Sequence, residues 1–483
     1  MTADDSPLEL SSETMRRMMA TAMERIVGHI EGLPAMPSAD TDTRGGVALA
    51  RSLAEPMPES GEPFERLLAL LFDDVVPRSF NTAGPGYLAY IPGGGLFHSA
   101  LAELIAGSVN RYVGVFQAAP GLAQIEANVV RWFCDIAGYP RGAGGILTTG
   151  GSLANLIALI TARRERLGEN FLSGTIYTSA QTHHSVQKAA LLAGFPARSV
   201  RQVPCDARYR VRVDVLQDMV AQDRHDGSTP FLIAGNAGTT NTGAVDDLAA
   251  LGALARRESL WFHVDGAYGG FFLLTERGRA VMAGIEQADS LTLDPHKALF
   301  LPYGTGSLLV KDAGALRRTH SHHAHYLPQM QSEDDLVDFC EISPELSRDF
   351  RGLRVWLPFK MHGAGVFRRA LDEKLDLARW AAAELSRLPH VEMLAEPQLS
   401  LLAFRLAPPG VAPGALNDLN RALLARINAR GRVYLTGTML DDVYALRICV
   451  LSFRTHMDRM RECLADIRES MAEAGAPAPN GGK

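Results

Sequence analysis

The sequence predicts an α/β fold whose main sheet is mostly parallel and is covered by helices on both faces. Two observations carry this prediction. After an expected helix at 120–137, and up to about residue 310, short apolar runs alternate with longer helical stretches, as in parallel strands joined by helices. With 483 residues, the chain is also too long for one ordinary core, so we expect two or three lobes. The expected strands are 145–147, 174–177, 197–202, 231–234, 260–264, 290–293 and 306–310.

Residues 1–85 are expected to form an N-terminal helical segment. Residues 11–33 fit an amphipathic helix that Ser12 can cap. Its apolar stripe consists of Met15, Met18, Met19, Ala22, Met23, Ile26 and Ile30. Residues 34–63 are rich in Pro, Gly, Ser and Asp and are interpreted as a linker with a short helix near 47–53, and a second helix is expected at 64–76. The apolar stripe packs either on its own domain or on a partner subunit.

Residues 86–365 are expected to form the large α/β domain, and residues 366–483 a small C-terminal α+β domain. The small domain is predicted from a second alternation of helical and extended stretches. Its expected helices are 379–385, 416–430 and 457–471, and its expected strands are 391–393, 401–405 and 445–450.

Composition and charge argue against several classes of protein. An apolar fraction of 47% and a charged fraction of 21% are typical of a globular enzyme rather than a disordered or fibrous chain. A net charge of −6 does not favour nucleic acid or an anionic membrane as a partner. No stretch approaches the roughly 20 apolar residues that span a bilayer. Five scattered cysteines and an acidic N-terminus without a signal sequence predict a cytoplasmic protein without disulfides.

Lys297 is the central candidate for a functional residue. It follows a short apolar strand and precedes an apolar run in Ser-Leu-Thr-Leu-Asp-Pro-His-Lys-Ala-Leu-Phe-Leu. A lysine in a partly dry pocket can lose its proton and attack a carbonyl, whereas an arginine cannot. From position alone, a lysine that reaches into solvent from a strand end is an equal alternative, so the neighbouring motifs decide.

Three further motifs fit a pocket for pyridoxal phosphate (PLP). Asp265 ends an apolar strand in His-Val-Asp-Gly-Ala-Tyr, where its carboxylate can keep a pyridine nitrogen protonated. Gly151 and Ser152 lie between a strand and a helix in Thr-Thr-Gly-Gly-Ser, a layout that offers free N–H groups to a phosphate. His183 follows a strand in Gln-Thr-His-His-Ser-Val, where its imidazole can stack on a ring. All four motifs fall at carboxyl ends of expected strands, where parallel sheets bind ligands.

These motifs resemble those of the group II PLP-dependent decarboxylases, the family of aromatic L-amino acid decarboxylase, within the fold-type I PLP enzymes. The resemblance runs from about Gly86 to Gly363. Its most specific motifs are Asp-Pro-His-Lys at 294–297, His-Val-Asp-Gly-Ala-Tyr at 263–268 and Gln-Thr-His-His-Ser-Val at 181–186. The resemblance implies a fold-type I transferase-like fold, PLP as cofactor, and a homodimer with N-terminal helices packed across the dimer.

The resemblance also implies roles for single residues. Lys297 would bind PLP covalently, Asp265 would pair with the protonated pyridine nitrogen, and His183 would stack over the ring. These three are the expected catalytic residues. The other implied cofactor contacts are Ala267 on the opposite ring face, Thr240 beside the cofactor, and Gly151, Ser152 and His296 near the phosphate.

The loop at 84–95 is similar to a loop that lines the substrate pocket in relatives. Tyr90 and Pro92 are therefore candidate substrate-binding residues, and a surface loop before an expected helix at 99–108 is the alternative. The loop is small and apolar on one side, so an aromatic substrate fits. A substrate with a carboxylate side chain would need an arginine, which Arg111 could provide.

Phe339 and Asp294 depart from the family pattern. Counted without gaps from Phe350, position 339 aligns with a loop tyrosine that in relatives returns a proton to the substrate carbon after CO2 leaves. Phenylalanine has no such proton, and in plant relatives it marks aldehyde synthases. Tyr326 or a histidine of the neighbouring cluster could serve instead. Asp294 stands where eukaryotic members commonly have asparagine, and we expect it to cap a loop.

The sequence therefore predicts a PLP-dependent carboxy-lyase that converts an L-amino acid, aromatic by preference, to its amine and CO2. We expect no metal, because the histidine cluster at 319–326 lacks acidic or cysteine ligands in a recognisable spacing. The expected partners are a small-molecule substrate and a second subunit. One alternative is an aldehyde synthase, or a decarboxylase of acidic or diamino acids, on the same scaffold. Another, from a different class, is an inactive PLP-binding or interaction module.

Overall fold

The computed structural model describes residues 8–322, 333 and 336–473, and its main sheet is mostly parallel, as predicted. Seven strands form this sheet in the order β1-β7-β6-β5-β4-β2-β3. β7 runs antiparallel to both of its neighbours, and the other pairs are parallel. The strands are β1 (Gly144–Thr148), β2 (Gly174–Ser179), β3 (Val200–Val203), β4 (Thr229–Asn236), β5 (Trp261–Gly266), β6 (Ser290–Leu293) and β7 (Gly306–Val310).

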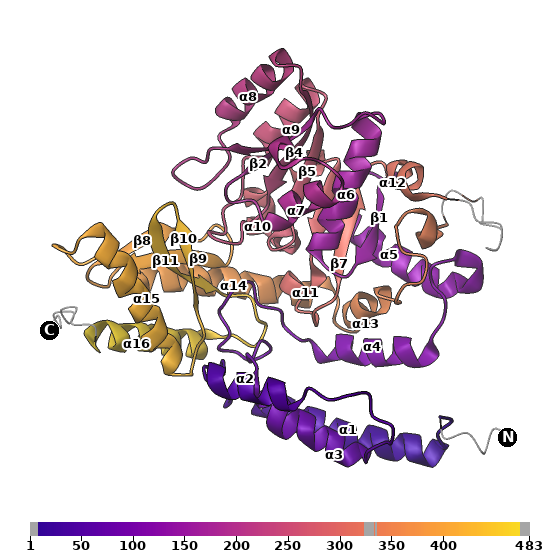
Figure 1. Ribbon diagram of the computed structural model, residues 1–483, viewed down its shortest axis with the longest axis vertical. Coiled ribbons are helices and arrows are strands. Elements are labelled where there is room, and N and C mark those ends of the chain that lie inside the picture. The colour runs from indigo at the N-terminus through magenta and orange to yellow at the C-terminus, as the bar shows by residue number, and fades with distance from the viewer. Residues whose placement is uncertain (1–7, 323–332, 334–335, 474–483) are drawn as a thin grey trace.

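Helices cover both faces of this sheet (Figure 1). The helices of the large domain are α4 (Phe97–Val109), α5 (Pro120–Ile136), α6 (Gly151–Arg166), α7 (His184–Leu192), α8 (Val213–His225), α9 (Leu248–Arg257), α10 (Glu276–Val281), α11 (Pro295–Ala298), α12 (Ala313–His320) and α13 (Gly352–His362). Short 3₁₀ turns include η6 (Gly270–Leu274) and η8 (Phe339–Glu341). The fold-type I architecture expected from the sequence is therefore present.

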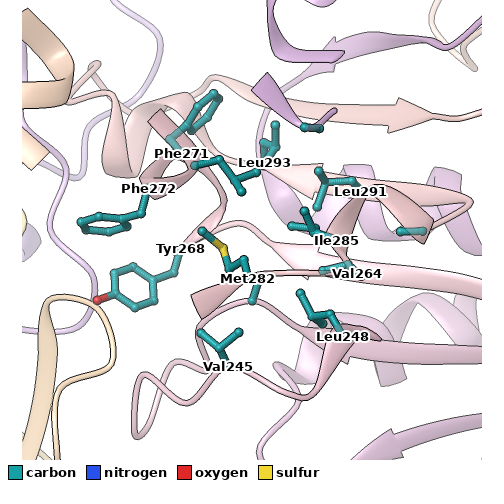
Figure 2. Close-up of a cluster of buried hydrophobic side chains, with 14 of the residues drawn as sticks. Val245, Leu248, Val264, Tyr268, Phe271, Phe272, Met282, Ile285, Leu291 and Leu293 are labelled. Carbon is teal, nitrogen blue, oxygen red and sulfur yellow. The ribbon is translucent and has the colours of Figure 1, made fainter. Parts of the chain in front are cut away.

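Two hydrophobic cores lie on opposite faces of the sheet. Ile176 of β2 packs in the core that contains α6, α7 and α12, and its neighbour Tyr177 packs in the core that contains α8 and α9. Successive side chains of a strand point to opposite faces, so Ile176 and Tyr177 contribute apolar side chains to both cores. Figure 2 shows part of the second core, where Val264 and Leu291 of the sheet lie near Phe271.

The small C-terminal domain has its own four-stranded antiparallel sheet, in the order β10-β11-β9-β8. Its elements are α14 (Ala364–Leu385), β8 (Val391–Ala395), β9 (Leu401–Leu406), α15 (Pro413–Ala429), β10 (Thr436–Leu440), β11 (Val443–Cys449) and α16 (Met457–Glu473). Sequence analysis did not predict β10. Its residues Thr-Gly-Thr-Met-Leu are half-buried to exposed in the middle of the strand and give no strong apolar signal.

The N-terminal segment extends along the outside of the body (Figure 1). It contains α1 (Ser12–Gly32), α2 (Thr43–Ser52) and α3 (Phe64–Ala69), which continues as a π-helix at Leu70–Val75. The capping residue lies one position before the predicted one, because Ser11 rather than Ser12 accepts the capping bond from the Thr14 N–H at 3.1 Å. α1 has no buried residue within one chain. Over the described ranges, every helix is too short or too polar to cross a bilayer.

Candidate active site

A cavity of about 300 Å³ lies at the carboxyl ends of the parallel strands. It brings together residues that are far apart in the sequence. The predicted cofactor residues Gly151, Ser152, His183, Thr240, Asp265, Ala267, His296 and Lys297 all line it. The geometry therefore assembles the four sequence motifs into one site, at the edge of the sheet where they were expected.

Lys297 projects into the cavity from α11, which follows β6 directly. Its Nζ lies 3.0 Å from Asp294 Oδ2. Burial alone would lower the pKa of the Lys297 amine, but the carboxylates of Asp294 and Asp265 outweigh it and raise that pKa. Sequence analysis expected a dry pocket to release the proton. The two carboxylates that face the amine favour its protonated form instead.

Asp294 does not cap the following helix, so the expectation of a capping role was wrong. No side-chain bond joins its carboxylate to the start of α11. The side chain instead points at Lys297 and is 3% exposed, and its Oδ1 has no hydrogen-bond partner. Asp294 therefore lines the cavity, although sequence analysis did not include it in the site.

Asp265 ends β5 at the floor of the cavity and is 8% exposed. Its Oδ2 accepts a hydrogen bond from Asn155 Nδ2 at 2.9 Å, and its Oδ1 accepts one from the Ala267 N–H at 3.1 Å. Both oxygens therefore have fixed N–H donors, which hold the carboxylate in one orientation.

His183 lies at the start of α7, with its ring against the cavity. Its Nδ1 lies 2.8 Å from Ser185 Oγ and 3.3 Å from the Ser185 backbone nitrogen. Burial lowers the pKa of His183, and the nearby Asp265 only partly opposes this effect. The ring is therefore neutral near pH 7.

The turn from β1 into α6 forms an open cradle at one end of the cavity. A side-chain carbon on Gly151 would lie 3.1 Å from Ala267 Cβ and 3.0 Å from Asp294 Oδ2, so only glycine leaves this space free. The first N–H groups of a helix have no partner within the helix, and together with the helix dipole they attract anions. The cradle therefore suits a phosphate group.

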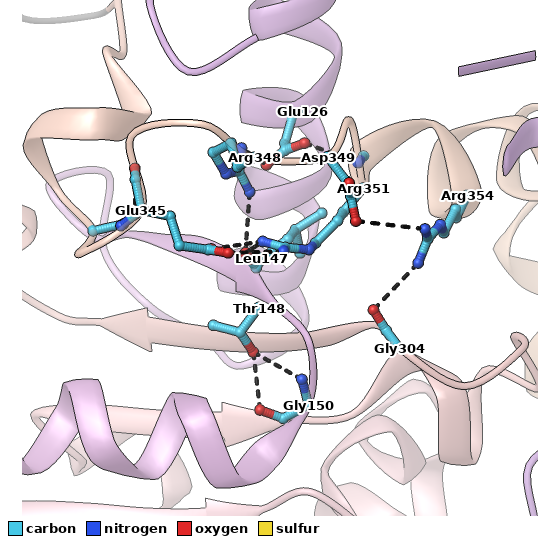
Figure 3. Close-up of polar contacts among 12 residues, drawn as sticks. Glu126, Leu147, Thr148, Gly150, Gly304, Glu345, Arg348, Asp349, Arg351 and Arg354 are labelled. Carbon is cyan, nitrogen blue, oxygen red and sulfur yellow. Dashed lines mark hydrogen bonds and ion pairs between the residues drawn. The ribbon is translucent and has the colours of Figure 1, made fainter. Parts of the chain in front are cut away.

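A block of arginines holds the backbone around this cradle (Figure 3). Arg348 and Arg351 both donate to the Leu147 carbonyl, at 3.0 and 3.2 Å, at the carboxyl end of β1. On the other side, Arg354 donates to the Gly304 carbonyl at 3.2 Å. The block therefore fixes the two backbone segments that flank the phosphate end of the cavity.

Glu126 of α5 forms a buried ion pair with Arg348, one arginine of this block. Its Oε1 lies 2.5 Å from Arg348 Nη1, with side-chain exposures of 0% and 1%, and its Oε2 accepts from the Gly352 N–H at 2.9 Å. We expect Glu126→Leu to lower the free energy of unfolding by about 3–5 kcal/mol, because a buried guanidinium loses its counter-ion. Urea unfolding measures this change. The exposed pair of Arg421 and Asp418 supplies a control, since Asp418→Leu should cost less than about 1 kcal/mol.

The loop with the predicted substrate residues Tyr90 and Pro92 approaches the cavity without lining it in this chain. Tyr90 is 52% exposed and Pro92 is buried. Arg447, from the small domain, connects the loop to the site. It donates to the Tyr90 carbonyl at 3.2 Å and to the Thr240 carbonyl. Sequence analysis did not identify Arg447, because nothing in the sequence pairs β11 with a loop some 350 positions earlier.

Phe339 is buried in η8, and its alignment with the loop tyrosine stays a prediction. Its ring is 1% exposed in η8 and packs with the core that contains α6, α7 and α12. The Arg348 guanidinium lies 4.9 Å from the ring centroid. Tyr326, the alternative donor, lies outside the described residues.

The histidine cluster is only partly described, since residues 323–326 lie outside the described ranges. Of its first members, His320 is partly buried, and burial lowers its pKa to about 4. In the described part of the chain, no group of three or more His, Cys, Asp or Glu side chains has the arrangement of a metal site.

Comparison with known proteins identifies the family and supports the fold. A model described as the pyridoxal-dependent decarboxylase conserved domain matches residues 48–407. The chain belongs to this family. It is 34% identical over 474 residues to an aromatic-L-amino-acid decarboxylase of Bacillus atrophaeus, with 98% of each chain covered. It is also 28% identical over 434 residues to a phenylacetaldehyde synthase of Arabidopsis thaliana, covering 87% of this chain and 89% of that protein.

A solved structure from the same family supports the architecture. Tryptophan decarboxylase of Catharanthus roseus, in complex with L-tryptophan, superposes with a TM-score of 0.90 at 27% identity. The superposition covers 97% of this chain and 100% of that one. The protein is thus a PLP-dependent decarboxylase that acts on an L-amino acid, as the sequence predicted.

PLP is the cofactor of this pyridoxal-dependent decarboxylase, and the residues of the cavity fit it. The cradle at Gly151 suits the phosphate, Lys297 would supply an amine for the aldehyde, and Asp265 would supply a carboxylate for the ring nitrogen. Asn155, Ser185 and Asn236 also belong to the site, and sequence analysis missed them. For Asn155 the signal was present, since it is a polar side chain in an apolar helical run four residues after Gly151.

Proposed function

We propose that this decarboxylase converts an aromatic L-amino acid to its amine and CO2. The observation that carries the proposal is that Lys297, Asp265 and His183 line one cavity in a chain closely related to an aromatic-L-amino-acid decarboxylase. The complex of the structural relative with L-tryptophan supports an aromatic substrate. Acidic and diamino acids remain the competing substrate classes.

The proposed roles follow from what each side chain can do. Lys297 binds the cofactor and afterwards accepts or returns a proton at the substrate carbon. Asp265 holds a proton on the pyridine nitrogen through its fixed carboxylate, and the neutral His183 ring packs on one ring face while Ala267 packs on the other. When bound, PLP supplies the electron sink that lets the bond between Cα and the carboxylate break. Gly151, Ser152, Thr240 and His296 complete the cofactor site, and Tyr90 and Pro92 belong to the substrate entrance.

A panel of L-amino acids tests the substrate class. With purified protein and added PLP, we expect CO2 release to be fastest with tryptophan, tyrosine or phenylalanine. Glutamate and 2,4-diaminobutyrate should give at least about 10²-fold lower kcat/KM, because the loop at 84–95, which we propose as the substrate entrance, contains no charged residue to pair with their side chains. Faster turnover of an acidic or diamino acid would contradict the aromatic assignment. No CO2 from any amino acid would favour the inactive binding module.

The product is the second point to test. We propose the amine, because the chain is 34% identical to an aromatic-L-amino-acid decarboxylase over 98% of its length. The similarity to a phenylacetaldehyde synthase keeps the aldehyde as the specific alternative. Under air, we expect one amine per CO2 and no consumption of oxygen. Aldehyde, ammonia and peroxide in proportion to CO2 would show that the alternative holds.

We also propose a homodimer that forms through the N-terminal segment. Met15, Met19 and Val27 of α1 and Leu67 and Leu71 of the next helices are 40–54% exposed in a single chain, and burial of such a face needs a second surface. Light scattering should give twice the 52.2 kDa of one chain. Met15→Glu combined with Met19→Glu should shift the mass toward the monomer. Met57→Glu, in the linker and 87% exposed, is the control and should remain dimeric.

The division into domains at 1–85, 86–365 and 366–483 and the cytoplasmic location are proposals as well. Separate sheets with separate hydrophobic clusters support the boundary between the large and small domains. Five free cysteines support a reducing compartment. Limited proteolysis would test the boundaries, since cleavage should begin in the linker before residue 64 and leave the large and small domains together.

A further inference from the structure

Asn155 lies beneath the cavity at the centre of a buried hydrogen-bond network. It is 2% exposed and comes from the second turn of α6. Its Nδ2 is 2.9 Å from Asp265 Oδ2 and 2.9 Å from Ser185 Oγ. Its Oδ1 is 2.7 Å from Thr292 Oγ1 and 3.0 Å from His263 Nε2. The amide therefore uses both of its hydrogens and both lone pairs of its oxygen.

The chemistry of the partners sets the direction of these bonds. A carboxylate only accepts, so the NH2 group of Asn155 must face Asp265, and its Oδ1 must face Thr292 and His263. Both of those partners then have to donate. In the neutral ring of His263, the proton therefore lies on Nε2.

The contacts of His263 Nδ1, on the other side of its ring, are consistent with a proton on Nε2. His263 Nδ1 lies 2.8 Å from Ser290 Oγ, and Trp261 Nε1 lies 2.8 Å from the same oxygen. An indole N–H only donates, so Ser290 accepts from Trp261 and uses its own hydrogen for His263. Burial lowers the pKa of His263 to about 4, which keeps its ring neutral.

A second branch runs from Asn155 to His183. Ser185 Oγ accepts one amide hydrogen of Asn155, so its own hydrogen is available for His183 Nδ1 at 2.8 Å. The backbone N–H of Ser185 points at the same ring nitrogen at 3.3 Å. Two donors at Nδ1 mean that this atom carries no proton, and the neutral ring of His183 must carry its proton on Nε2.

We propose that Asn155 is a positioning residue that orients Asp265 and selects the tautomer of His183 at the same time. One amide hydrogen fixes the carboxylate, and the other fixes the Ser185 hydroxyl that faces the imidazole. The inference rests on the roles proposed above for Asp265 and His183. No contact of Asn155 with the substrate is needed.

A neutral His183 ring favours the protonated pyridine nitrogen that Asp265 is proposed to hold. A protonated pyridine nitrogen is favoured by the anion of Asp265 and disfavoured by a second cation nearby. A neutral His183 can pack on the ring without that repulsion. The charged and titratable groups around His183 are Asp265 and Asp294, which favour its protonation, and His184 and Lys297, which oppose it. The donors from Ser185 add a geometric reason for the neutral ring.

Ring nitrogen NMR on the ¹⁵N-histidine-labelled full chain tests the proposal before PLP is added. The signals of His183 are identified by their loss in His183→Gln. In the unmodified chain at pH 7, we expect Nδ1 to be unprotonated and Nε2 to be protonated. Protonated Nδ1 would overturn the proposal.

Two substitutions at Asn155 test whether this residue orients Asp265 and selects the tautomer of His183. In Asn155→Asp, the new carboxylate accepts from the Ser185 hydroxyl and draws it away from His183, so the ring should protonate at higher pH. Asn155→Ala removes both donors without adding charge. In both variants, the dissociation constant of PLP should rise about tenfold or more, because a charge-assisted hydrogen bond to Asp265 is lost. Unchanged ring signals and unchanged PLP affinity in folded Asn155→Ala would overturn the proposal.

Asn420 supplies the matched control. It is an equally buried asparagine of the small domain, with bonds of 2.8 Å to the backbone of Leu406 and Leu416. Asn420→Ala should lower stability without changing the His183 signals or the PLP affinity, and equal changes would contradict a specific role of Asn155. If the Asn155 variants do not fold, Ser185→Ala tests the branch alone. It should alter the ring signals of His183, and unaltered signals would overturn that branch.

The outcome is distinguishable from failure of the proposed function. The ring signals are measured without cofactor, so they do not depend on which lysine binds PLP. Attachment of PLP to another lysine would refute the proposed roles and leave the tautomer result standing. Normal attachment at Lys297 together with a wrong tautomer would refute only the positioning role of Asn155.

Discussion

Lys297→Ala is expected to lower the rate of CO2 release by about 10²–10⁴-fold or more, because it removes both the covalent attachment of PLP and a base at the substrate carbon. The cradle at Gly151 and the carboxylate of Asp265 remain, so PLP should still bind without a covalent bond. The visible absorbance of the bound cofactor should change accordingly. Turnover and absorbance are measured on the same preparation.

Lys311→Ala is the control for this prediction. Lys311 follows β7, and its Nζ donates to the Glu286 carbonyl at 2.7 Å on the surface. Its loss should leave turnover near the unmodified value. Near-normal turnover of Lys297→Ala would mean that another amine serves the reaction.

Asp265→Asn is expected to lower turnover by about 10²–10³-fold, the usual cost of one lost electrostatic contact to the reacting group. The amide keeps the shape of the carboxylate and loses the charge that holds the ring nitrogen protonated. The substitution also places an NH2 group or a neutral oxygen opposite Asn155. The affinity for PLP should fall less than turnover, because the phosphate cradle is unchanged. Titration with PLP and steady-state kinetics separate the two effects.

Asp289 offers a matched control for Asp265. Its Oδ2 accepts from the Phe262 N–H at 2.8 Å, at the opposite end of the same strands. Asp289→Asn should lower stability at most and leave turnover intact. If Asp265→Asn instead kept most of its turnover, the pairing with the ring nitrogen would have to be abandoned.

The sequence was sufficient to predict the large sheet and the location of the site. Most strands of this sheet contain a short apolar stretch, and each motif residue lies at or just after the carboxyl end of a strand, so local signals carried the information. The same residues then converged in one cavity. β10 was missed because its middle is half-buried to exposed, and its pairing with β11 is a tertiary contact.

Electrostatics and distant contacts could not be predicted in the same way. The raised pKa of Lys297 depends on the distance to Asp294, which the side chain's direction sets and the sequence does not show. Arg447 meets Thr240 only after the small domain packs on the large one. The alignment of Phe339 stays a prediction, because a count along the chain alone cannot place a residue across a variable loop.

Borohydride reduction followed by peptide mapping tests the central claim most directly. Reduction fixes the cofactor on the lysine that holds it, and digestion then shows which peptide carries the added pyridoxyl mass. The account predicts a single labelled peptide that contains Asp294 and Lys297, and no label in Lys297→Ala. A label on Lys188, Lys311 or Lys374 in the unmodified chain would contradict the assignment of the active site.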